Sequence, residues 1–374
     1  MTDIAPQTDR GGKRVRRLFL RLLLSLAATL VALGVAEIVL RVVGYPQFLE
    51  PHSDPPRFAF INADSAIGPV YLNMPGRITF RYDGNPRGYF DEQNEVHHDV
   101  NPSGFRGPAF RPKAPGTGHL IFLGDSFTFG EGVHNNDTYP QVAARLLRKD
   151  EQRVEVFNLG VGGYNTSQEA QVLKLFGLDL QPDVVVVGYT LNDAEPPLYQ
   201  VDPASGKPVR RPREAIIESE AAPRRPPDSF LYRLRLAQAF WLASQQSHLT
   251  KQTVDYYLSL HDQASAGRIE SERALREIIT ECNKRGVPCI VVVFPVLYSL
   301  SKDYPFTVIH EQIGQVVRQA DGHVIDLLPA LMDQNASALI VHPTDQHPNE
   351  KVHALAGQLV AQEILRISKS SPKR

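Results

Sequence analysis

The chain has 374 residues, enough for one large domain or two smaller ones with a sizeable buried core. Its 40 lysine and arginine residues nearly balance 41 aspartate and glutamate residues, so no overall basic excess points to a nucleic-acid partner. The two cysteines exclude a disulfide-rich scaffold and a four-cysteine zinc site.

The first element in the chain is a largely apolar segment with a basic flank. Residues Leu18–Leu40 are long enough to cross a bilayer core of about 30 Å. The basic flank precedes the uncharged stretch Leu22–Ala36 and consists of Arg10, Lys13, Arg14, Arg16, Arg17 and Arg21, the last of which lies near the start of the span. By the positive-inside rule this flank stays in the cytoplasm, and everything after Val43 lies outside. The sequence therefore predicts a cytoplasmic tail (residues 1–17), a transmembrane signal-anchor helix (18–43) and an extracytoplasmic remainder, in the periplasm or at the cell surface.

Two other interpretations of this segment stay open. A cleaved signal peptide would need a small-x-small cleavage site after the apolar run, and the following EIVLRVVGYP (residues 37–46) contains none. A buried helix of a soluble protein would not usually carry six basic residues on one flank. The uncleaved single-pass anchor is therefore the prediction.

Residues 44–115 are rich in proline, glycine and aromatic residues and have no helical period. Their pattern indicates short strands and turns, either as a small β-rich lead-in packed on the main domain or as a spacer. The aromatic residues favour packing: Tyr71, Phe80, Tyr82, Tyr89, Phe90 and Phe105.

From residue 116 the chain alternates between apolar strands and amphipathic helices. The predicted strands cover residues 119–124, 153–160, 182–190, 287–295 and 323–329. Such alternation is typical of an α/β fold with a parallel sheet between two layers of helices. Residues 116–368 are thus predicted to form a three-layer αβα sandwich with a five-stranded, flavodoxin-like sheet.

Residues 194–264 interrupt this alternation with proline- and arginine-rich pieces, followed by the amphipathic FLYRLRLAQAFWLASQQ (residues 230–246). The segment is longer than a connection between a strand and a helix requires. It is either a loop with a packing helix or a lid or substrate platform, and both interpretations stay open. Its arginines hint at an anionic glycan or a lipid headgroup as a neighbour, although such charges are usually solvated.

Cys282 and Cys289 flank a predicted helix-to-strand turn. They could pair in an oxidising compartment, but two unpaired thiols are the prediction.

Polar residues follow the predicted strands where their carboxyl ends meet at one edge of the sheet. Asp125 and Ser126 follow the first strand, a glycine-rich turn ending at Gly163 follows the second, and Asn192 follows the third. Asp345 and His347 come after the last strand. Serine, histidine and aspartate at one edge can form a nucleophilic triad. The glycine turn and the asparagine amide can donate hydrogen bonds to an oxyanion.

The blocks that carry these residues resemble those of the SGNH (GDSL-type) hydrolase superfamily, including its membrane-anchored bacterial members. The matching blocks are FLGDSFTFGEGV (122–133), NLGVGGYNTSQEA (158–170), VVVGYTLND (185–193) and DQHPNEKVH (345–353), and the resemblance covers residues 118–365. It implies that Ser126 is the nucleophile and that its N–H, the Gly163 N–H and the Asn192 side chain form the oxyanion hole. His347 would be the general base and then acid, and Asp345 would hold its tautomer.

Other polar residues near these blocks receive structural interpretations. One residue separates Asp345 from His347, where the family often has two. His342 and His353 are predicted to be surface or capping residues, and Asp125 to stabilise the nucleophile turn. Arg106 either forms a structural ion pair, which is favoured, or binds a substrate carboxylate.

Together these observations predict an extracytoplasmic, membrane-anchored serine esterase that hydrolyses a short-acyl carboxylic ester through an acyl-serine. No cofactor and no metal are expected. The alternatives are an O-acyltransferase that uses the same triad on an envelope polysaccharide, and a non-catalytic binding platform in envelope assembly.

Overall fold

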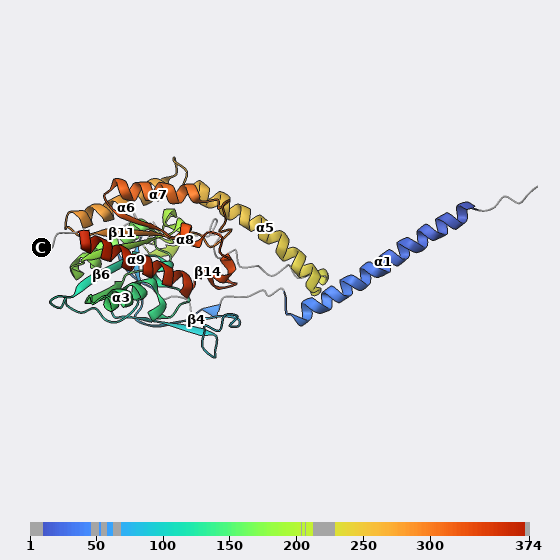
Figure 1. Cartoon of the computed structure of the whole chain (residues 1–374), viewed down its shortest axis with the longest axis horizontal. Helices are drawn as coiled ribbons and strands as arrows, with labels where there is room; N and C mark the ends of the chain where they lie inside the picture. The colour runs from blue at the N-terminus through green and yellow to red at the C-terminus, as the bar shows by residue number, and fades with distance from the viewer. Residues whose placement is uncertain are drawn as a thin grey trace, which may run out of the picture. The chain divides into compact units, whose positions relative to one another are not determined.

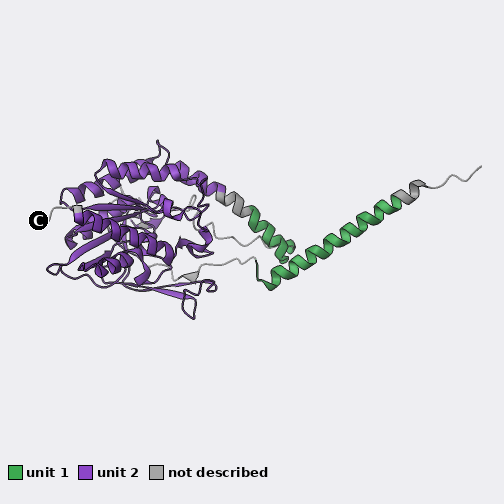
Figure 2. Cartoon of the chain, in the orientation of Figure 1, with its two compact units in different colours: residues 1–49, 220–250 green, residues 50–219, 251–374 purple. Residues whose placement is uncertain are grey.

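The computed structural model describes residues 10–45, 52–53, 58–62, 69–202, 204–205, 207–211 and 229–370. The chain divides into two compact units (Figure 2). The N-terminal unit comprises residues 1–49 and 220–250, and the main unit comprises residues 50–219 and 251–374.

The N-terminal unit is built on one long helix, α1 (Arg10–Val42). Its section Val15–Val42 is long and apolar enough to cross a membrane and is unburied in the structure. The helix begins before residue 18, so residues 10–17, predicted as part of the tail, are helical; arginine and lysine are good helix formers and extend the apolar helix backwards. Residues 1–9 of the predicted tail lie outside the described residues.

The same unit contains the amphipathic segment predicted over residues 230–246. The 3₁₀ turn η5 (Phe230–Arg233) precedes helix α5 (Arg235–Leu260). The helix thus starts five residues later than the amphipathic pattern and runs fourteen residues beyond it (Figure 1).

The main unit contains the predicted five-stranded parallel sheet. Its strands are β6 (Gly118–Gly124), β7 (Val154–Asn158), β8 (Val184–Tyr189), β11 (Cys289–Val293) and β12 (His323–Asp326). They pair in the order β12-β11-β8-β6-β7, with parallel neighbours throughout. All residues of β8 and β11 are buried, as expected for strands covered on both faces. The predicted flavodoxin-like sheet is confirmed.

Two layers of helices enclose this sheet (Figure 1). Helix α3 (Tyr139–Lys149) packs against α9 (Glu350–Ser370) in one layer. In the other layer α6 (Ala266–Asn283) contacts both α4 (Thr166–Val172) and α7 (Thr307–Gln319). Both arrangements bury the apolar stripes of the helices in one continuous core.

The lead-in is packed on the main domain, so the spacer alternative is wrong. Strands β1 (His52–Ser53), β4 (Gly76–Arg81) and β5 (Glu95–Val100) form one antiparallel sheet, and β2 (Phe58–Asn62) pairs with β3 (Val70–Asn73). Tyr71 and Phe105 are fully buried in the main core. This anchoring brings the strand end at Tyr82 to the carboxyl edge of the sheet.

The first part of the insertion forms a hairpin that the sequence pattern did not indicate. Strands β9 (Tyr199–Val201) and β10 (Pro208–Arg210) pair antiparallel. The ring centroids of Tyr199 and Tyr71 lie 5.0 Å apart. Residues 212–228 of the insertion lie outside the described residues.

Cys282 and Cys289 are both buried, unpaired thiols, as predicted. A hydrogen bond to Cys282 and burial raise the pKa of the Cys289 thiol well above its ordinary value, so the Cys289 thiol resists ionisation.

The remaining short elements are α2 (Ser126–Phe129), α8 (Leu328–Leu331), β13 (Ile340–His342), β14 (Asp345–Pro348), the π-helical turn Leu173–Gly177, and the 3₁₀ turns Asn135–Asp137, Leu178–Leu180, Leu191–Ala194 and Ala336–Ala338.

Candidate active site

Ser126 lies at the sharp turn between β6 and the short helix α2. The Asp125 carboxylate caps this helix by accepting a hydrogen bond from the Phe127 N–H at 2.8 Å, which confirms its predicted role in the turn. Gly124 allows the turn to close, because a Cβ there would lie 2.0 Å from Oγ1 of Thr128. The chain therefore turns tightly enough to present the serine hydroxyl at the carboxyl edge of the sheet.

The structure brings Ser126, His347 and Asp345 together in one chain of hydrogen bonds. Nε2 of His347 lies 2.9 Å from Oγ of Ser126, and Nδ1 lies 2.5 Å from Oδ1 of Asp345. Asp345 and His347 are carried by β14, which pairs with β13 in a hairpin that the sequence analysis missed. Residues i and i+2 of a strand face the same side, so the one-residue spacing brings both side chains to the serine.

Tyr82, the residue that follows β4, completes this chain on the far side of Asp345. Its hydroxyl donates to Oδ2 of Asp345 at 2.7 Å, and the His347 N–H donates to Oδ1 at 3.0 Å. Burial raises the pKa of Asp345, but His347 and the hydrogen bonds outweigh this and lower it to about 2. Asp345 is therefore ionised at neutral pH. Tyr82 was predicted only as a packing aromatic.

Asn192 is held beside the nucleophile turn by polar contacts. Its amide donates to Oδ2 of Asp125 at 3.0 Å. The Thr190 hydroxyl contacts both Oδ2 of Asp125 and Oδ1 of Asn192. The Asp125 carboxylate thus orients both the serine turn and the asparagine amide. One N–H of the Asn192 amide remains for a substrate oxygen.

Two backbone N–H groups complete the predicted oxyanion hole. Neither the Ser126 N–H nor the Gly163 N–H has a hydrogen-bond partner among the residues that the structure describes. Gly163 has φ +79°, and a Cβ there would lie 2.8 Å from Leu198 of the insertion. The insertion therefore packs directly against the oxyanion turn.

Glu131 is a site residue that the sequence analysis missed. Its carboxylate lies 3.6 Å from Nε2 of His347, and its side chain is 23% exposed. A Cβ on Gly162 would lie 2.7 Å from the same carboxylate, so this glycine makes room for it. Burial raises the pKa of Glu131, and the charge of His347 opposes this. Glu131 lies in the same block as Ser126, FLGDSFTFGEGV (122–133).

We expect Glu131→Gln to move the acid limb of the pH–rate profile to lower pH. A carboxylate beside His347 favours the protonated imidazole, so removing that charge leaves the base neutral in more acidic solution. A shift of up to about one pH unit is expected for a partly exposed pair. Ester hydrolysis measured between pH 4 and 9 checks this, with the exposed Glu311→Gln as the matched control. An unmoved acid limb would contradict the electrostatic role of Glu131.

Two further carboxyl groups, Glu169 and Asp193, are buried behind the site. Both carboxylate oxygens of Glu169 and Oδ1 of Asp193 have no hydrogen-bond partner among the described residues. Burial, followed by the charges of neighbouring carboxylates including Asp125, raises the pKa of both groups well above their ordinary values. The folded protein therefore holds protons here that the unfolded chain releases.

Glu169→Gln should make the protein's stability less dependent on pH. With a raised folded-state pKa, the contribution of Glu169 is fully present below its ordinary pKa of 4.5 and is lost as pH rises toward the folded-state value. The loss is at most about 1.4 kcal/mol per pH unit for one proton, and the uncharged amide avoids it. Thermal unfolding between pH 5 and 9 should show the variant above wild type at the alkaline end. The exposed Glu92→Gln is the control, and parallel pH curves would refute this account.

Arg106 does not form the predicted ion pair with any described residue. Its buried guanidinium donates hydrogen bonds to the carbonyls of Phe129, Gly130 and Val133, at 2.7, 2.5 and 2.6 Å. The prediction of an ion pair is wrong because three backbone carbonyls of the loop after α2 accept hydrogen bonds from the N–H groups of the guanidinium. Arg106 thereby fixes the loop that carries Glu131.

His342 and His353 lie outside the hydrogen-bond chain of Ser126, but both are buried, so their predicted surface position is wrong. Nδ1 of His353 accepts the Tyr139 N–H at 3.1 Å, a capping contact at the start of α3. Burial, Arg106 and His347 lower the pKa of His353 to about 3, so it stays neutral.

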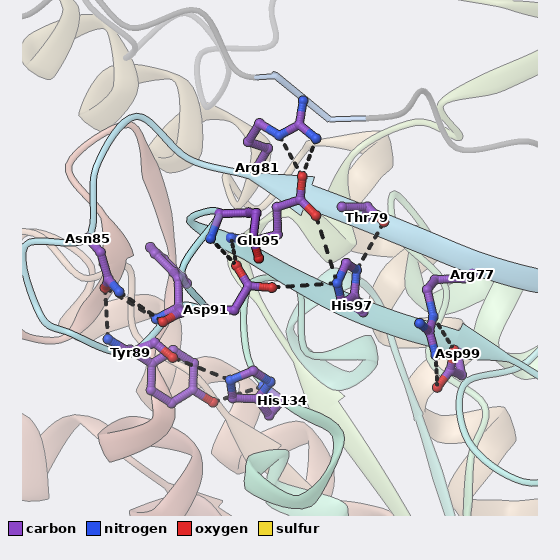
Figure 3. Close-up of polar contacts among 12 residues, drawn as sticks. Arg77, Thr79, Arg81, Asn85, Tyr89, Asp91, Glu95, His97, Asp99 and His134 are labelled. Atoms are coloured by element: carbon purple, nitrogen blue, oxygen red, sulfur yellow. Dashed lines mark hydrogen bonds and ion pairs between the residues drawn. The ribbon is translucent and has the colours of Figure 1, made fainter.

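One side-chain group in the described part of the chain is compact enough to hold a cation. Figure 3 shows His97 between Asp91 and Glu95 on the lead-in, with Nε2 3.6 Å and 3.8 Å from their carboxylates. Arg81 forms an ion pair with Glu95, and the Thr79 hydroxyl contacts Nδ1 of His97 at 3.1 Å. Two members of the cluster therefore already interact with other protein side chains. None of these residues takes part in the hydrogen-bond chain of Ser126.

The family model of the GDSL-like lipase/acylhydrolase family matches residues 122–355, which include all four predicted blocks. The chain belongs to this family. It is accordingly an SGNH-type serine hydrolase that acts on ester bonds. A comparison with curated protein sequences gave no match.

Solved structures similar to this hydrolase include a lipase/acylhydrolase from Enterococcus faecalis (16% identity, 69% of this chain and 99% of that chain, TM-score 0.39). AlinE4, an SGNH-hydrolase family esterase, is 18% identical over 70% of this chain and 100% of its own, with a TM-score of 0.36. Esterase EstA from Pseudoalteromonas sp. is 11% identical over 67% of this chain and 99% of its own, with a TM-score of 0.36.

Proposed function

We propose that this chain is a membrane-anchored, extracytoplasmic esterase that cleaves a short-acyl carboxylic ester through an acyl-serine intermediate. The observation that carries the proposal is the unbroken chain of hydrogen bonds from Ser126 through His347 and Asp345 to Tyr82. A nucleophile, a base and an orienting carboxylate within hydrogen-bond distance constitute the arrangement that acyl transfer requires.

In the proposed reaction, Oγ of Ser126 attacks the ester carbonyl carbon while Nε2 of His347 takes the hydroxyl proton. The carbonyl oxygen becomes an oxyanion that accepts hydrogen bonds from the N–H groups of Ser126 and Gly163 and from the Asn192 amide. His347 then protonates the departing alkoxide, and the C–O bond of the ester breaks to leave acyl-Ser126. Water, deprotonated by His347, attacks this intermediate and releases the acid.

The preference for short acyl groups follows from the surroundings of Ser126. Glu131 places a partly buried carboxyl group beside His347, and burying an apolar chain against a polar group that it cannot hydrogen-bond is unfavourable. The ester substrate is an acylated glycan or a lipid in this proposal. The transferase and binding-platform alternatives gain no specific support from the site, where every predicted catalytic group is present.

The proposed location rests on α1 and its flank. The basic residues cluster at the N-terminal end of α1, and the helix section Val15–Val42 is unburied in the structure. The positive-inside rule then leaves the N-terminus in the cytoplasm and places the main unit outside.

Full-length protein in detergent should react with a serine-directed fluorophosphonate, and peptide mapping should find the adduct on Ser126. The same preparation should hydrolyse p-nitrophenyl acetate faster than p-nitrophenyl decanoate. Formation of acylated sugar with an added sugar acceptor, at the expense of free acid, would favour transfer instead. A folded protein with no adduct would refute the acyl-serine mechanism.

A further inference from the structure

The C-terminal turns of α1 bind a segment almost two hundred residues further along the chain. The Glu37 carboxylate accepts hydrogen bonds from the N–H groups of Arg235 and Leu236, at 3.0 and 2.9 Å. Arg41 donates to the Arg233 carbonyl at 3.1 Å and pairs with Glu37 at 2.7 Å. The first N–H groups of a helix lack intrahelical acceptors and favour negative charge, so Glu37 serves as an external cap for α5.

The length of α1 fixes where these contacts lie relative to a bilayer. Its membrane-compatible section has 28 residues, about 42 Å at 1.5 Å per residue, whereas a hydrocarbon core is about 30 Å thick. A core that begins at Leu18 is filled after about 20 residues, close to Glu37. Glu37 and Arg41 then lie among the lipid headgroups, where charged side chains are tolerated. The segment that they hold lies at the same depth.

That segment exposes large apolar side chains. Phe230 and Phe240 are each 79% exposed and Leu231 is 66% exposed, whereas the core of the main unit buries such residues. The Arg233 guanidinium lies over the Phe230 ring at 5.5 Å. The Trp241 ring lies 6.4 Å from that of Tyr232. Aromatic side chains interleaved with arginine are typical of segments in a membrane interface.

We propose that residues 230–241 form an interfacial segment that inserts its apolar side chains into the lipid leaflet at the C-terminal end of α1. This inference rests on the membrane anchor of the proposed function. Its partner is the bilayer surface, with anionic lipids favoured by Arg41, Arg233 and Arg235. The insertion thereby returns to the membrane where α1 leaves it, and the protein is attached at two segments instead of one.

The single tryptophan of the chain, Trp241, offers a direct test. Full-length protein is reconstituted into vesicles of phosphatidylcholine and phosphatidylglycerol at a 3:1 ratio, with or without lipids brominated near the headgroup or deep in the acyl chain. We expect shallow bromines to quench about half of the Trp241 emission and deep bromines to quench less. Glu37→Ala should reduce the quenching about twofold, because the segment loses its attachment to α1. Glu92→Ala, an exposed carboxylate on the main unit, should leave the quenching unchanged.

Flotation of the same vesicles separates the possible failures. Protein that floats after a carbonate wash but whose Trp241 emission is indifferent to bromine overturns the interfacial segment and leaves the anchor intact. A blue-shifted emission without bromine quenching means that protein covers Trp241, which also overturns the proposal. Protein that does not float removes the anchor and this inference together, while hydrolysis of p-nitrophenyl acetate still reports on the esterase separately.

Discussion

Replacing Asp345 by alanine is expected to lower kcat for ester hydrolysis by about 10⁴-fold while leaving the protein folded. The carboxylate holds Nδ1 of His347 at 2.5 Å and stabilises the imidazolium that forms when Ser126 loses its proton. Because its pKa is lowered to about 2, this carboxylate is ionised across the working pH range, and alanine removes the full charge. Steady-state kinetics with p-nitrophenyl acetate and a thermal unfolding curve measure the two effects.

Asp345→Asn should retain more activity than Asp345→Ala. Oδ1 accepts from both the backbone N–H and Nδ1 of His347, so the amide oxygen of asparagine takes this position. The amide nitrogen then faces the Tyr82 hydroxyl, which can accept as well as donate. The tautomer of His347 is kept and only the charge is lost. Asp303→Asn, on the exposed surface, is the matched control, and equal activity of Asp345→Ala and wild type would exclude Asp345 from the reaction.

The sheet could be predicted from the sequence because buried parallel strands appear there as short apolar runs between amphipathic helices. The four valines of residues 184–187 became the fully buried β8. The site residues could also be predicted from the sequence. The carboxyl ends of neighbouring parallel strands meet at one edge of the sheet, whatever their separation in the chain. Ser126, His347 and Asp345 lie within hydrogen-bond distance for this reason.

The residues that sequence reasoning missed depend on contacts between distant segments. Tyr82 and Asp345 are 263 positions apart, and no periodicity connects a lead-in strand end with a C-terminal hairpin. Glu131 follows Ser126 by five residues, but only the packing of its loop around Arg106 turns it toward His347. Buried charge is usually paired with charge, so a guanidinium held by three carbonyls was not anticipated. Propensity and pattern describe elements, whereas these contacts depend on how the elements pack.

Replacing Asn192 by alanine should lower kcat by about 10²- to 10³-fold with little change in KM, the cost of one lost oxyanion donor. Its amide is oriented by Asp125 and Thr190 in the free protein, so it needs no rearrangement when charge develops on the substrate oxygen. Asn136→Ala, at an exposed position, controls for the loss of an amide, and thermal unfolding controls for the partner that Asp125 loses. Thr190→Val should cause a smaller loss, because it removes only the contacts that orient Asn192. A decrease below tenfold for Asn192→Ala would leave oxyanion stabilisation to the N–H groups of Ser126 and Gly163 alone.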